Sequence, residues 1–415
     1  MLKKLTLKNW KSFQEAELPI EFLTILIGTN ASGKSNALDA LDFLQRTAQG
    51  KDLESALAGD RQTAGIRGGV EWVSLQPYDQ FALEVVVGTE DPSVDYYYYI
   101  EIEKSPQLQI IEESLTKITP KITPPLDIFL TNPVSWNKPS IPVILHNRDE
   151  EKPIEMLRSV SILSQLQRLP IDNGEIVNGT ARVCIALREI FILDPIPSNM
   201  RNYSRLTESL YSDASNIAGV LAALKKDKKE EIENLISSYL TQLPESEVSG
   251  VWAETVGKFN SDAMLYCNEK WSKNDFPTTI DARAMSDGTL RFLAILTALL
   301  TRPEGSQIVI EEVDNGLHPS RASLLLKMLI EISEQRQIDV LVTTHNPALL
   351  DELDLELVPS VIVAHRDPET GYSQLIRLED LNNLPKLMAS GSLGKITSRG
   401  LLEQSLSQTN RGKEG

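Results

Sequence analysis

The sequence is poor in cysteine, histidine and positive charge. Its 415 residues include two cysteines and four histidines, too few for a disulfide framework or a cysteine-rich zinc site. Lys and Arg number 41 against 58 Asp and Glu, so the formal net charge is −17. A field of that sign disfavours a broad surface for nucleic acid, although a local basic patch is still allowed. No apolar run has the length of a membrane span, and no signal-peptide core follows Met1. We therefore expect a cytoplasmic protein without a membrane segment.

Residues suited to a folded core are abundant. Hydrophobic residues make up 41% of the chain, and their periodicity changes along it. The segments LKKLTLKNWKSF and FLTILIG predict strands, residues 35–49 predict a helix, and FALEVVVG with YYYYIEIEK predicts a hairpin. Dense prolines predict irregular structure or edge strands over 117–153. Helical patterns cover 155–169 and 206–272, strand-like and helix-like segments alternate over 278–366, and the last dozen residues resemble a disordered tail.

The most specific motif is GTNASGKS, which occupies residues 28–35. It matches the pattern G-x-x-x-x-G-K-[ST] between an apolar strand and a helix, where glycines allow backbone N–H groups to face phosphates. Lys34 then adds a positive charge between the β and γ phosphates, and the Ser35 hydroxyl can ligate Mg²⁺. The motif predicts a nucleotide site that comprises Gly28, Thr29, Asn30, Ala31, Ser32, Gly33, Lys34, Ser35 and Asn36.

Two later strands end in side chains that suit phosphate chemistry. The strand IVI runs into Glu311 and Glu312, and the strand VLVTT runs into His345. Because adjacent strand residues point to opposite faces, the two acids are expected to differ in role. One would hold Mg²⁺ and the other would orient and polarise the attacking water, while a neutral imidazole at residue 345 could reach the γ-phosphate or that water.

A fourth segment, AMSDGTLRFLAILTALL, predicts a helix that starts near Thr289. Ser286 is its expected N-cap, with Asp287 and Gly288 in the cap region. A capped helix start is also an anion site, since its N–H groups and its dipole favour negative charge. By itself the segment indicates only a helix with a hydrophobic body.

The order of these four motifs resembles the ATPase heads of the ABC type, and more narrowly the branch that contains the SMC, RecF and OLD proteins. The opening LKKLTLKNWKSF is similar to the first strand of that branch, and EEVDNGLHP is similar to its E-E-P-E-x-x-L-H-P form. The resemblance covers residues 1–49 and 278–366. It implies a Walker A loop at Gly28–Ser35, a signature at Ser286–Thr289, a Walker B acid at Glu311, a catalytic base at Glu312, a D-loop at Asn315–His318 and a switch histidine at His345.

This sequence departs from the family pattern at three places. Glu311 stands where most ABC proteins have Asp, and the signature is SDGT in place of SGGQ, which puts a γ-phosphate contact from Asp287 in doubt. The family also has a glutamine-bearing loop that links the lobes, for which Gln165 and Gln167 are both candidates. Several OLD-like proteins carry a C-terminal nuclease domain, and no such domain is expected after the strand at His365.

The resemblance implies an α/β fold, a P-loop NTPase head of the ABC type with a mixed or parallel core sheet, an antiparallel β subdomain and a helical insertion. The expected parts are an N-terminal lobe (1–200), the insertion (201–277), a C-terminal lobe (278–383), and short C-terminal helices with a disordered tail (384–415). In residues 384–406, glycines at 391, 394 and 400 break the helical face, so short helices are expected. They would either pack on the head or offer a docking surface.

The function implied first is an ATPase, with ATP and Mg²⁺ as cofactors, whose head forms a homodimer around two nucleotides. Ser286–Gly288 of one subunit would complete the site of the other. Such stand-alone heads resemble the ATPases of bacterial defence modules, which act with a separately encoded nuclease or toxin. The alternative is a RecF-like DNA-repair ATPase that clamps DNA. A transporter subunit and an ATP-gated scaffold that hardly hydrolyses are the remaining readings, and the retained Glu312 argues against the scaffold.

Overall fold

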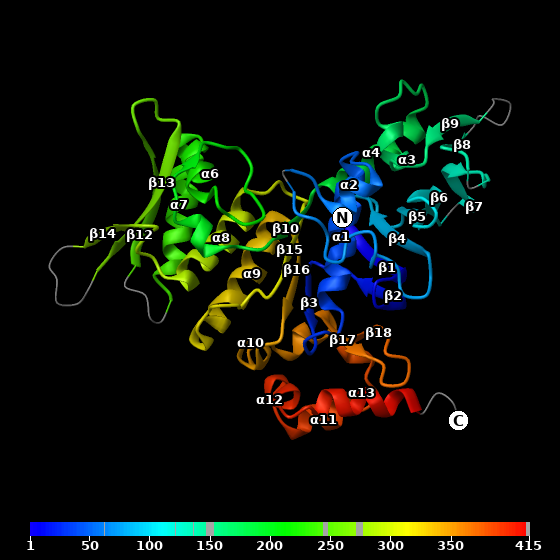
Figure 1. Ribbon diagram of the computed structural model, residues 1–415. Helices are drawn as coiled ribbons and strands as arrows, with labels where there is room; N and C mark the ends of the chain where they lie inside the picture. Colours follow the sequence, from blue (N-terminus) through cyan, green and yellow to red (C-terminus); the bar gives the residue numbers. More distant parts are fainter. Residues whose placement is uncertain are drawn as a thin grey trace. The chain divides into compact units, whose positions relative to one another are not determined.

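The computed structural model describes residues 1–61, 63–120, 122–135, 137–146, 153–243, 248–270 and 277–411 (Figure 1). The chain divides into two compact units. Unit 1 comprises Met1–Ile190, Ser360–Leu381 and Leu406–Gly415, and unit 2 comprises Phe191–Pro359 and Asn382–Ser405. The change of unit after Ile190 lies close to the boundary expected at residue 200. The four-part division expected from the sequence otherwise stays a prediction.

An antiparallel sheet of eight strands dominates unit 1, in the order β2-β1-β4-β5-β6-β7-β8-β9. The expected hairpin is confirmed as β4 and β5, whose register pairs Val85 with Tyr98. Tyr96 and Tyr98 are buried and Tyr97 and Tyr99 are half-buried, as alternation along a strand requires. The strands of this sheet are β1 (Leu2–Trp10), β2 (Phe13–Pro19), β4 (Gln80–Gly88), β5 (Asp95–Glu103), β6 (Gln109–Thr119), β7 (Ile122–Thr131), β8 (Ser140–Leu145) and β9 (Ile154–Leu157).

The prediction of irregular structure or edge strands over 117–153 is wrong for β7 and β8, whereas residues 132–135 and 137–139 form no strand, as expected. β7 pairs with β6 on one side and with β8 on the other, so it lies inside the sheet. The register between β6 and β7 shifts twice, at Leu115/Thr116 and Lys117/Thr119, and these irregularities accommodate a strand that contains two prolines. Residues 147–152 lie outside the described residues.

A second layer of unit 1 carries the GTNASGKS loop. The strand β3 (Leu23–Ile27) pairs in parallel with β17 (Val361–Arg366), which pairs antiparallel with β18 (Ser373–Arg377). This arrangement confirms a mixed sheet with parallel pairs. The helices of unit 1 are α1 (Lys34–Ala48), α2 (Leu53–Ala58), α3 (Ile162–Leu166) and α4 (Gly174–Arg188), with the 3-10 turn η3 (Leu378–Asp380). The helix expected over 155–169 is only α3, because its first residues form β9.

Unit 2 contains a second parallel pair, β15 (Gln307–Ile310) with β16 (Asp339–Thr344), and β10 (Ile190–Leu193) lies beside β15. The expected alternation of strands and helices is confirmed here. In α8 (Asp287–Thr301), every residue apart from Asp287, Arg291 and Thr301 is buried, which explains its continuous apolar sequence. The helical segments that follow β10 in this unit are α5 (Pro197–Met200), α6 (Ile217–Ala223), α7 (Lys226–Leu240), α8 (Asp287–Thr301), η1 (Pro319–Arg321), α9 (Ala322–Arg336), α10 (Pro347–Asp351) and η2 (Leu355–Ser360).

The insertion at residues 201–277, which was expected to be helical, contains both helices and an antiparallel sheet. Its strands β12 (Val248–Val256) and β13 (Asp262–Glu269) form a long hairpin, joined by β11 (Ser204–Arg205) and β14 (Thr278–Asp281). The helices α6 and α7 lie against this sheet (Figure 1). The segment SGVWAETVGKFN has neither a clear period-2 pattern nor a strong turn signal, so its cross-strand pairs, such as the stacked Trp252 and Tyr266, were not visible in the sequence.

The expected short C-terminal helices are confirmed as α11 (Leu384–Ser390), α12 (Leu393–Ser398) and α13 (Leu401–Arg411). Gly391 and Gly400 separate them, and Gly400 has a φ of 67°. Within unit 2, α12 packs on α10, where a Cβ on Gly394 would lie 2.0 Å from the Pro347 carbonyl oxygen. The packing interpretation therefore holds for α12. The disordered tail was a wrong prediction up to Arg411, because α13 includes residues 404–411.

Asp339, at the first position of β16, is a buried carboxyl group of unit 2. Its side chain is 3% exposed, and burial raises its pKa from 3.8 to about 7. The folded state therefore binds a proton at the Asp339 carboxyl group more tightly than the unfolded state does. The contribution of this difference to the free energy of unfolding is lost as the pH rises from about 4 to about 7. We predict that Asp339→Asn raises the free energy of unfolding above pH 7, by as much as about 4 kcal/mol at 1.36 kcal/mol per pH unit. Denaturant melts at pH 5 and pH 8 test this, and an equal gain at both pH values would contradict it.

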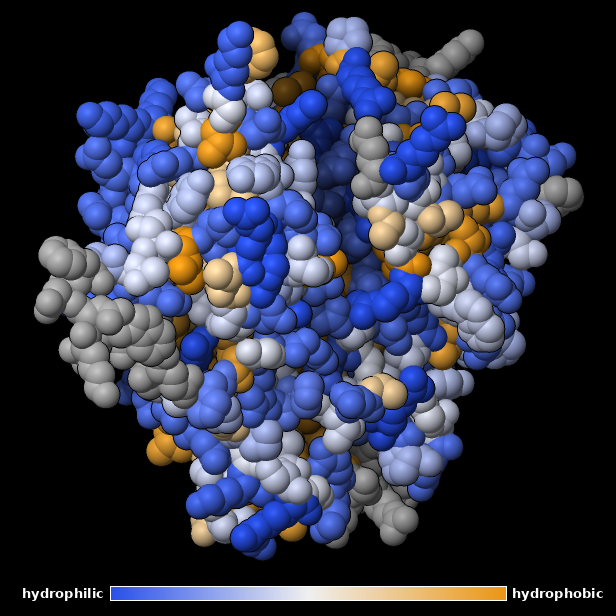
Figure 2. Space-filling model, turned by 60° about the vertical axis from the view of Figure 1, so that its left-hand side comes forward, coloured by the Kyte–Doolittle hydropathy of each residue, from blue (hydrophilic) through white to orange (hydrophobic). Residues whose placement is uncertain are grey.

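The surface agrees with the composition. The face in Figure 2 is largely hydrophilic, and apolar residues are scattered over it singly or in small groups. In the described part of the chain, no helix combines the length and the apolar character that a membrane span needs. The two cysteines are buried thiols.

Candidate functional site

The loop Gly28–Ser35 connects β3 to α1, as its sequence predicts. Gly28 and Gly33 have φ values of 148° and 113°, and Ala31 has a φ of 64°. A Cβ on Gly28 would lie 2.2 Å from the carbonyl oxygen of Ala364, and a Cβ on Gly33 would lie 2.5 Å from Ser373 Oγ. Both positions therefore need glycine for space as well as for backbone conformation.

Lys34 folds back over this loop. Its Nζ donates to the carbonyl oxygens of Gly28 and Thr29, at 2.6 and 2.9 Å, and its residue is 8% exposed. An ammonium group that has left water needs acceptors, and the loop carbonyls supply them. The hydroxyl of Ser32 is buried as well and has no hydrogen-bond partner among the described residues. The loop thus keeps a cation and an unused hydroxyl close to the backbone that an anion would meet.

A hollow of about 430 Å³ lies beside the loop in unit 1. Its lining includes three cationic side chains and an exposed indole, and the full set is Lys11, Ser12, Asn36, Arg67, Gly68, Trp72, Ser74, Leu75, Gln76 and Arg366. Arg366 Nε donates to the carbonyl oxygen of Ala31 at 3.0 Å, and Asn36 Nδ2 donates to Ser12 Oγ at 2.8 Å. Trp72 is 58% exposed. The hollow therefore combines positive charge with a flat aromatic face.

Two of the three cations of the hollow are held by one carboxylate. Asp39 of α1 pairs with Lys11 at 2.5 Å and with Arg67 at 3.0 Å. Burial lowers the pKa of Lys11 against the attraction of Asp39. Sequence reasoning singled out Asn36 alone in this hollow, because Lys11, Arg67, Trp72 and Arg366 stand in segments that are far apart along the chain and share no motif.

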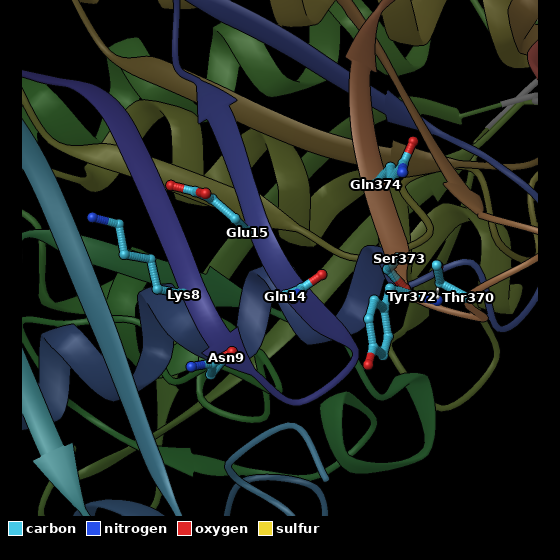
Figure 3. A pocket seen from close by; sticks show the side chains of 8 residues that line it. All are labelled: Lys8, Asn9, Gln14, Glu15, Thr370, Tyr372, Ser373 and Gln374. Carbon is cyan, nitrogen blue, oxygen red and sulfur yellow. Dashed lines mark hydrogen bonds between the residues drawn. The ribbon is translucent and has the colours of Figure 1, made fainter. Parts of the chain in front are cut away.

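A second hollow, of about 560 Å³, lies between the β1–β2 hairpin and the β17–β18 hairpin (Figure 3). Its lining is polar and consists of Lys8, Asn9, Gln14, Glu15, Thr370, Tyr372, Ser373 and Gln374. Ser373 closes it toward the loop, because its N–H donates to the Ser12 carbonyl oxygen at 2.8 Å and its Oγ donates to Ser12 Oγ at 2.8 Å. These hydrogen bonds fix the position of Ser373 next to Gly33.

In unit 2, the paired acids follow β15 in a turn. Glu312 has a φ of 48°, so it has left the strand, and the expectation that the two acids alternate on opposite faces of a strand is wrong. The N–H of Glu312 donates to Thr343 Oγ1 at 2.8 Å, and the N–H of Val313 donates to the Thr343 carbonyl oxygen at 3.0 Å. β16 therefore fixes the position of Glu312 through Thr343.

The structure brings Glu312 and His345 together. His345 Nδ1 lies 3.7 Å from Glu312 Oε1, and the two side chains are 51% and 41% exposed. Asn315 Nδ2 donates to Glu312 Oε2 at 3.3 Å. Next to this pair, Thr344 Oγ1 donates to the buried Asp314 at 2.6 Å. A carboxylate and an imidazole that are accessible and this close can orient a water molecule and receive its proton.

The predicted signature begins α8. Ser286 Oγ accepts a hydrogen bond from the N–H of Thr289 at 3.1 Å, which confirms the N-cap. A Cβ on Gly288 would lie 2.9 Å from the carbonyl oxygen of Gly316 and 3.0 Å from Arg321 Nη1. The segment Asn315–His318 therefore lies against the start of α8. Arg201, which no motif indicated, also touches this helix start.

The side chains of both candidate glutamines already form hydrogen bonds within unit 1. Gln165 Nε2 donates to the carbonyl oxygens of Leu157 and Val160, and its Oε1 accepts from the N–H of Leu157. Gln167 Nε2 donates to Thr180 Oγ1 at 2.7 Å. These bonds join α3 to its neighbours in unit 1. The assignment of either residue to a lobe-linking loop stays a prediction.

The donor set fits Mg²⁺ only together with a nucleotide. Among the described residues, no group of three or more His, Cys, Asp and Glu side chains could hold a metal ion. Mg²⁺ is usually held by one or two protein oxygens, by substrate phosphates and by water, so a protein cage is not required. Ser35 at the start of α1 and Glu311 after β15 are oxygen donors of the right kind.

Comparisons with known proteins indicate an ATPase. Residues 1–167 match the family described as "AAA ATPase domain", and residues 192–351 match the family described as "AAA domain, putative AbiEii toxin, Type IV TA system". An "ATP/GTP phosphatase" of Helicobacter pylori is 24% identical over 378 residues, which are 85% of this chain and 88% of the relative. A solved Smc head, bound to the C-winged helix domain of ScpA, has a TM-score of 0.53 at 14% identity and covers 90% of this chain and 97% of its own. That likeness concerns the fold.

Proposed function

We propose that this ATPase, whose fold is similar to that of an Smc head, is a head of the ABC type and acts as an ATP-dependent dimer. Each active site would take its Walker motifs from one subunit and Ser286–Gly288 from the other. The observation that supports hydrolysis is the pair Glu312–His345, since a head that only bound nucleotide would not need an accessible carboxylate 3.7 Å from an imidazole.

Gly28–Ser35 would hold the triphosphate. Its glycines let the backbone N–H groups approach the phosphates, and Lys34 would exchange its carbonyl partners for phosphate oxygens. Arg67 and Arg366 line the hollow beside the loop and would add positive charge there. The indole of Trp72 would stack on the base.

Glu312 would act as the general base toward the attacking water, and His345 would orient that water or contact the γ-phosphate. The hydrogen bonds from the Glu312 N–H to Thr343 and from Asn315 to the carboxylate hold the base in one orientation. Ser35 and Glu311 would hold Mg²⁺, which neutralises phosphate charge when it is bound. The remaining contribution, Ser286–Gly288, would come from the second subunit.

We also propose a biological role, the regulatory ATPase of a bacterial defence module with a separately encoded effector. The description that matches residues 192–351, which names a toxin and a toxin–antitoxin system, supports this role. The net charge of −17 supports a protein effector over a DNA ligand.

Phage challenge tests the role. Cells that carry the gene with its neighbouring genes should plate phage at reduced efficiency, and Lys34→Ala should restore plating because nucleotide binding is lost. Should no phage be restricted while the purified protein binds DNA with a steep salt dependence, the RecF-like alternative would replace the defence role.

A further inference from the structure

Asp287 creates an electrostatic problem at the start of α8. It is the first residue of the helix, and its side chain is 69% exposed. A carboxylate at a helix N-terminus stabilises the helix dipole, yet it repels a phosphate that approaches the same N–H groups. A site for phosphate at Ser286–Gly288 therefore needs a cation that outweighs Asp287.

Arg201 is positioned to supply that cation. Its Nη2 donates to Asp287 Oδ1 and to the carbonyl oxygen of Met285, both at 2.8 Å, and its Nη1 donates to the Pro197 carbonyl oxygen at 3.3 Å. Arg201 is the C-cap of α5, and the preceding Met200 is fully buried, so the backbone under the guanidinium is anchored. The contacts join α5 to the first turn of α8 within unit 2.

The guanidinium group keeps the capacity to bind a further anion. Its side chain is 27% exposed. Within the described part of the chain, three hydrogen bonds use three of its five N–H donors. A phosphate, like a carboxylate, matches the planar, bidentate donor set of a guanidinium group. Asp287 would then serve as a placeholder that holds the guanidinium in place until the phosphate arrives.

We propose that Arg201 is a phosphate-binding residue that acts in trans, on the nucleotide held by a second copy of the chain. The inference rests on the proposed dimer with composite sites. A simpler role would be to neutralise Asp287, and a merely structural role would be to tie α5 to α8. The three roles predict different behaviour of single and double variants.

Arg201→Ala and Arg201→Lys separate these roles. Both variants should bind a fluorescent ATP analogue as monomers with wild-type affinity, because the Walker A loop is intact. Arg201→Ala should lower turnover by a factor of about 10³, the lower end of what an arginine finger contributes. Arg201→Lys keeps the charge but loses the bidentate geometry, so it should fold with an unchanged melting temperature and still lose about tenfold or more in turnover. The matched control is Arg205→Ala, which removes an exposed arginine from β11 nearby.

The double variant Arg201→Ala/Asp287→Asn decides between binding and neutralisation. If Arg201 binds phosphate, the double variant stays as inactive as Arg201→Ala. Recovery of turnover in the double variant, or full turnover in Arg201→Lys, would overturn the proposal. Ser286→Arg distinguishes its failure from that of the dimer. If Ser286→Arg abolishes ATP-driven dimerisation and Arg201→Ala has no effect, only the role of Arg201 is refuted; if neither has an effect, the composite site itself is wrong.

Discussion

Glu312→Gln is expected to lower ATP turnover by a factor of about 10² to 10⁴, the usual contribution of a positioned general base. The substitution keeps the shape of the side chain and its acceptor for Asn315, which donates to Glu312 Oε2 at 3.3 Å. Nucleotide should therefore still bind, while the attacking water is no longer activated. Because hydrolysis would normally release the dimer, the ATP-bound dimer of the variant should persist for longer than that of the wild type.

Light scattering coupled to size exclusion, with and without Mg²⁺ and ATP, measures the dimer, and phosphate release measures turnover. Glu304→Gln is a suitable control, because it makes the same chemical change at an exposed position just before β15. The model of an ATP-driven dimer is refuted if wild type and Glu312→Gln both remain monomers with ATP. Wild-type turnover in Glu312→Gln would instead remove Glu312 from the mechanism.

The sequence predicted those parts of the site that are local. The loop Gly28–Ser35, the cap at Ser286 and the strand ends at Glu311 and His345 each depend on a strand or helix next to the motif. Their neighbours in sequence encode that element, so the structure has them where they were expected. The approach of His345 to Glu312 was not predicted, because it depends on the parallel pairing of β15 with β16, which no local motif indicates.

The remaining site residues depend on pairings between distant segments. Arg366 reaches the carbonyl oxygen of Ala31 only because β17 pairs with β3, although more than 300 residues separate them. Arg67 lies in a glycine-rich loop without any periodicity, and Arg201 follows a helix of only four residues. No local pattern marks these arginines. The same limit explains the wrong predictions for β7 and β8 and for β12 and β13, because these strands are stabilised by their partners in the sheet.

Complementation between two inactive variants is the second large effect that we expect. Lys34→Ala removes the ammonium from the Walker A loop, and Ser286→Arg fills the start of α8 with a bulky side chain and replaces the hydroxyl that caps it. Each variant alone should lose nearly all turnover. In a mixture, each mixed dimer has one site free of both changes, whereas neither homodimer has such a site. Turnover should then recover, to at most about half of the wild-type value if every chain is in a mixed dimer and the two sites act independently.

The recovery of turnover must depend on the exchange of subunits between dimers, so preventing that exchange is the control. Cross-linked homodimers of each variant, mixed after cross-linking, should show no recovery, and turnover of the exchangeable mixture should peak at a ratio of one to one. If sizing confirms mixed dimers and turnover stays at the level of the separate variants, Ser286 does not act in trans. Ser286 would then serve only as the N-cap of α8, through its hydrogen bond with the N–H of Thr289. The proposed role of Arg201 would be refuted as well, because no phosphate of a second subunit would reach it.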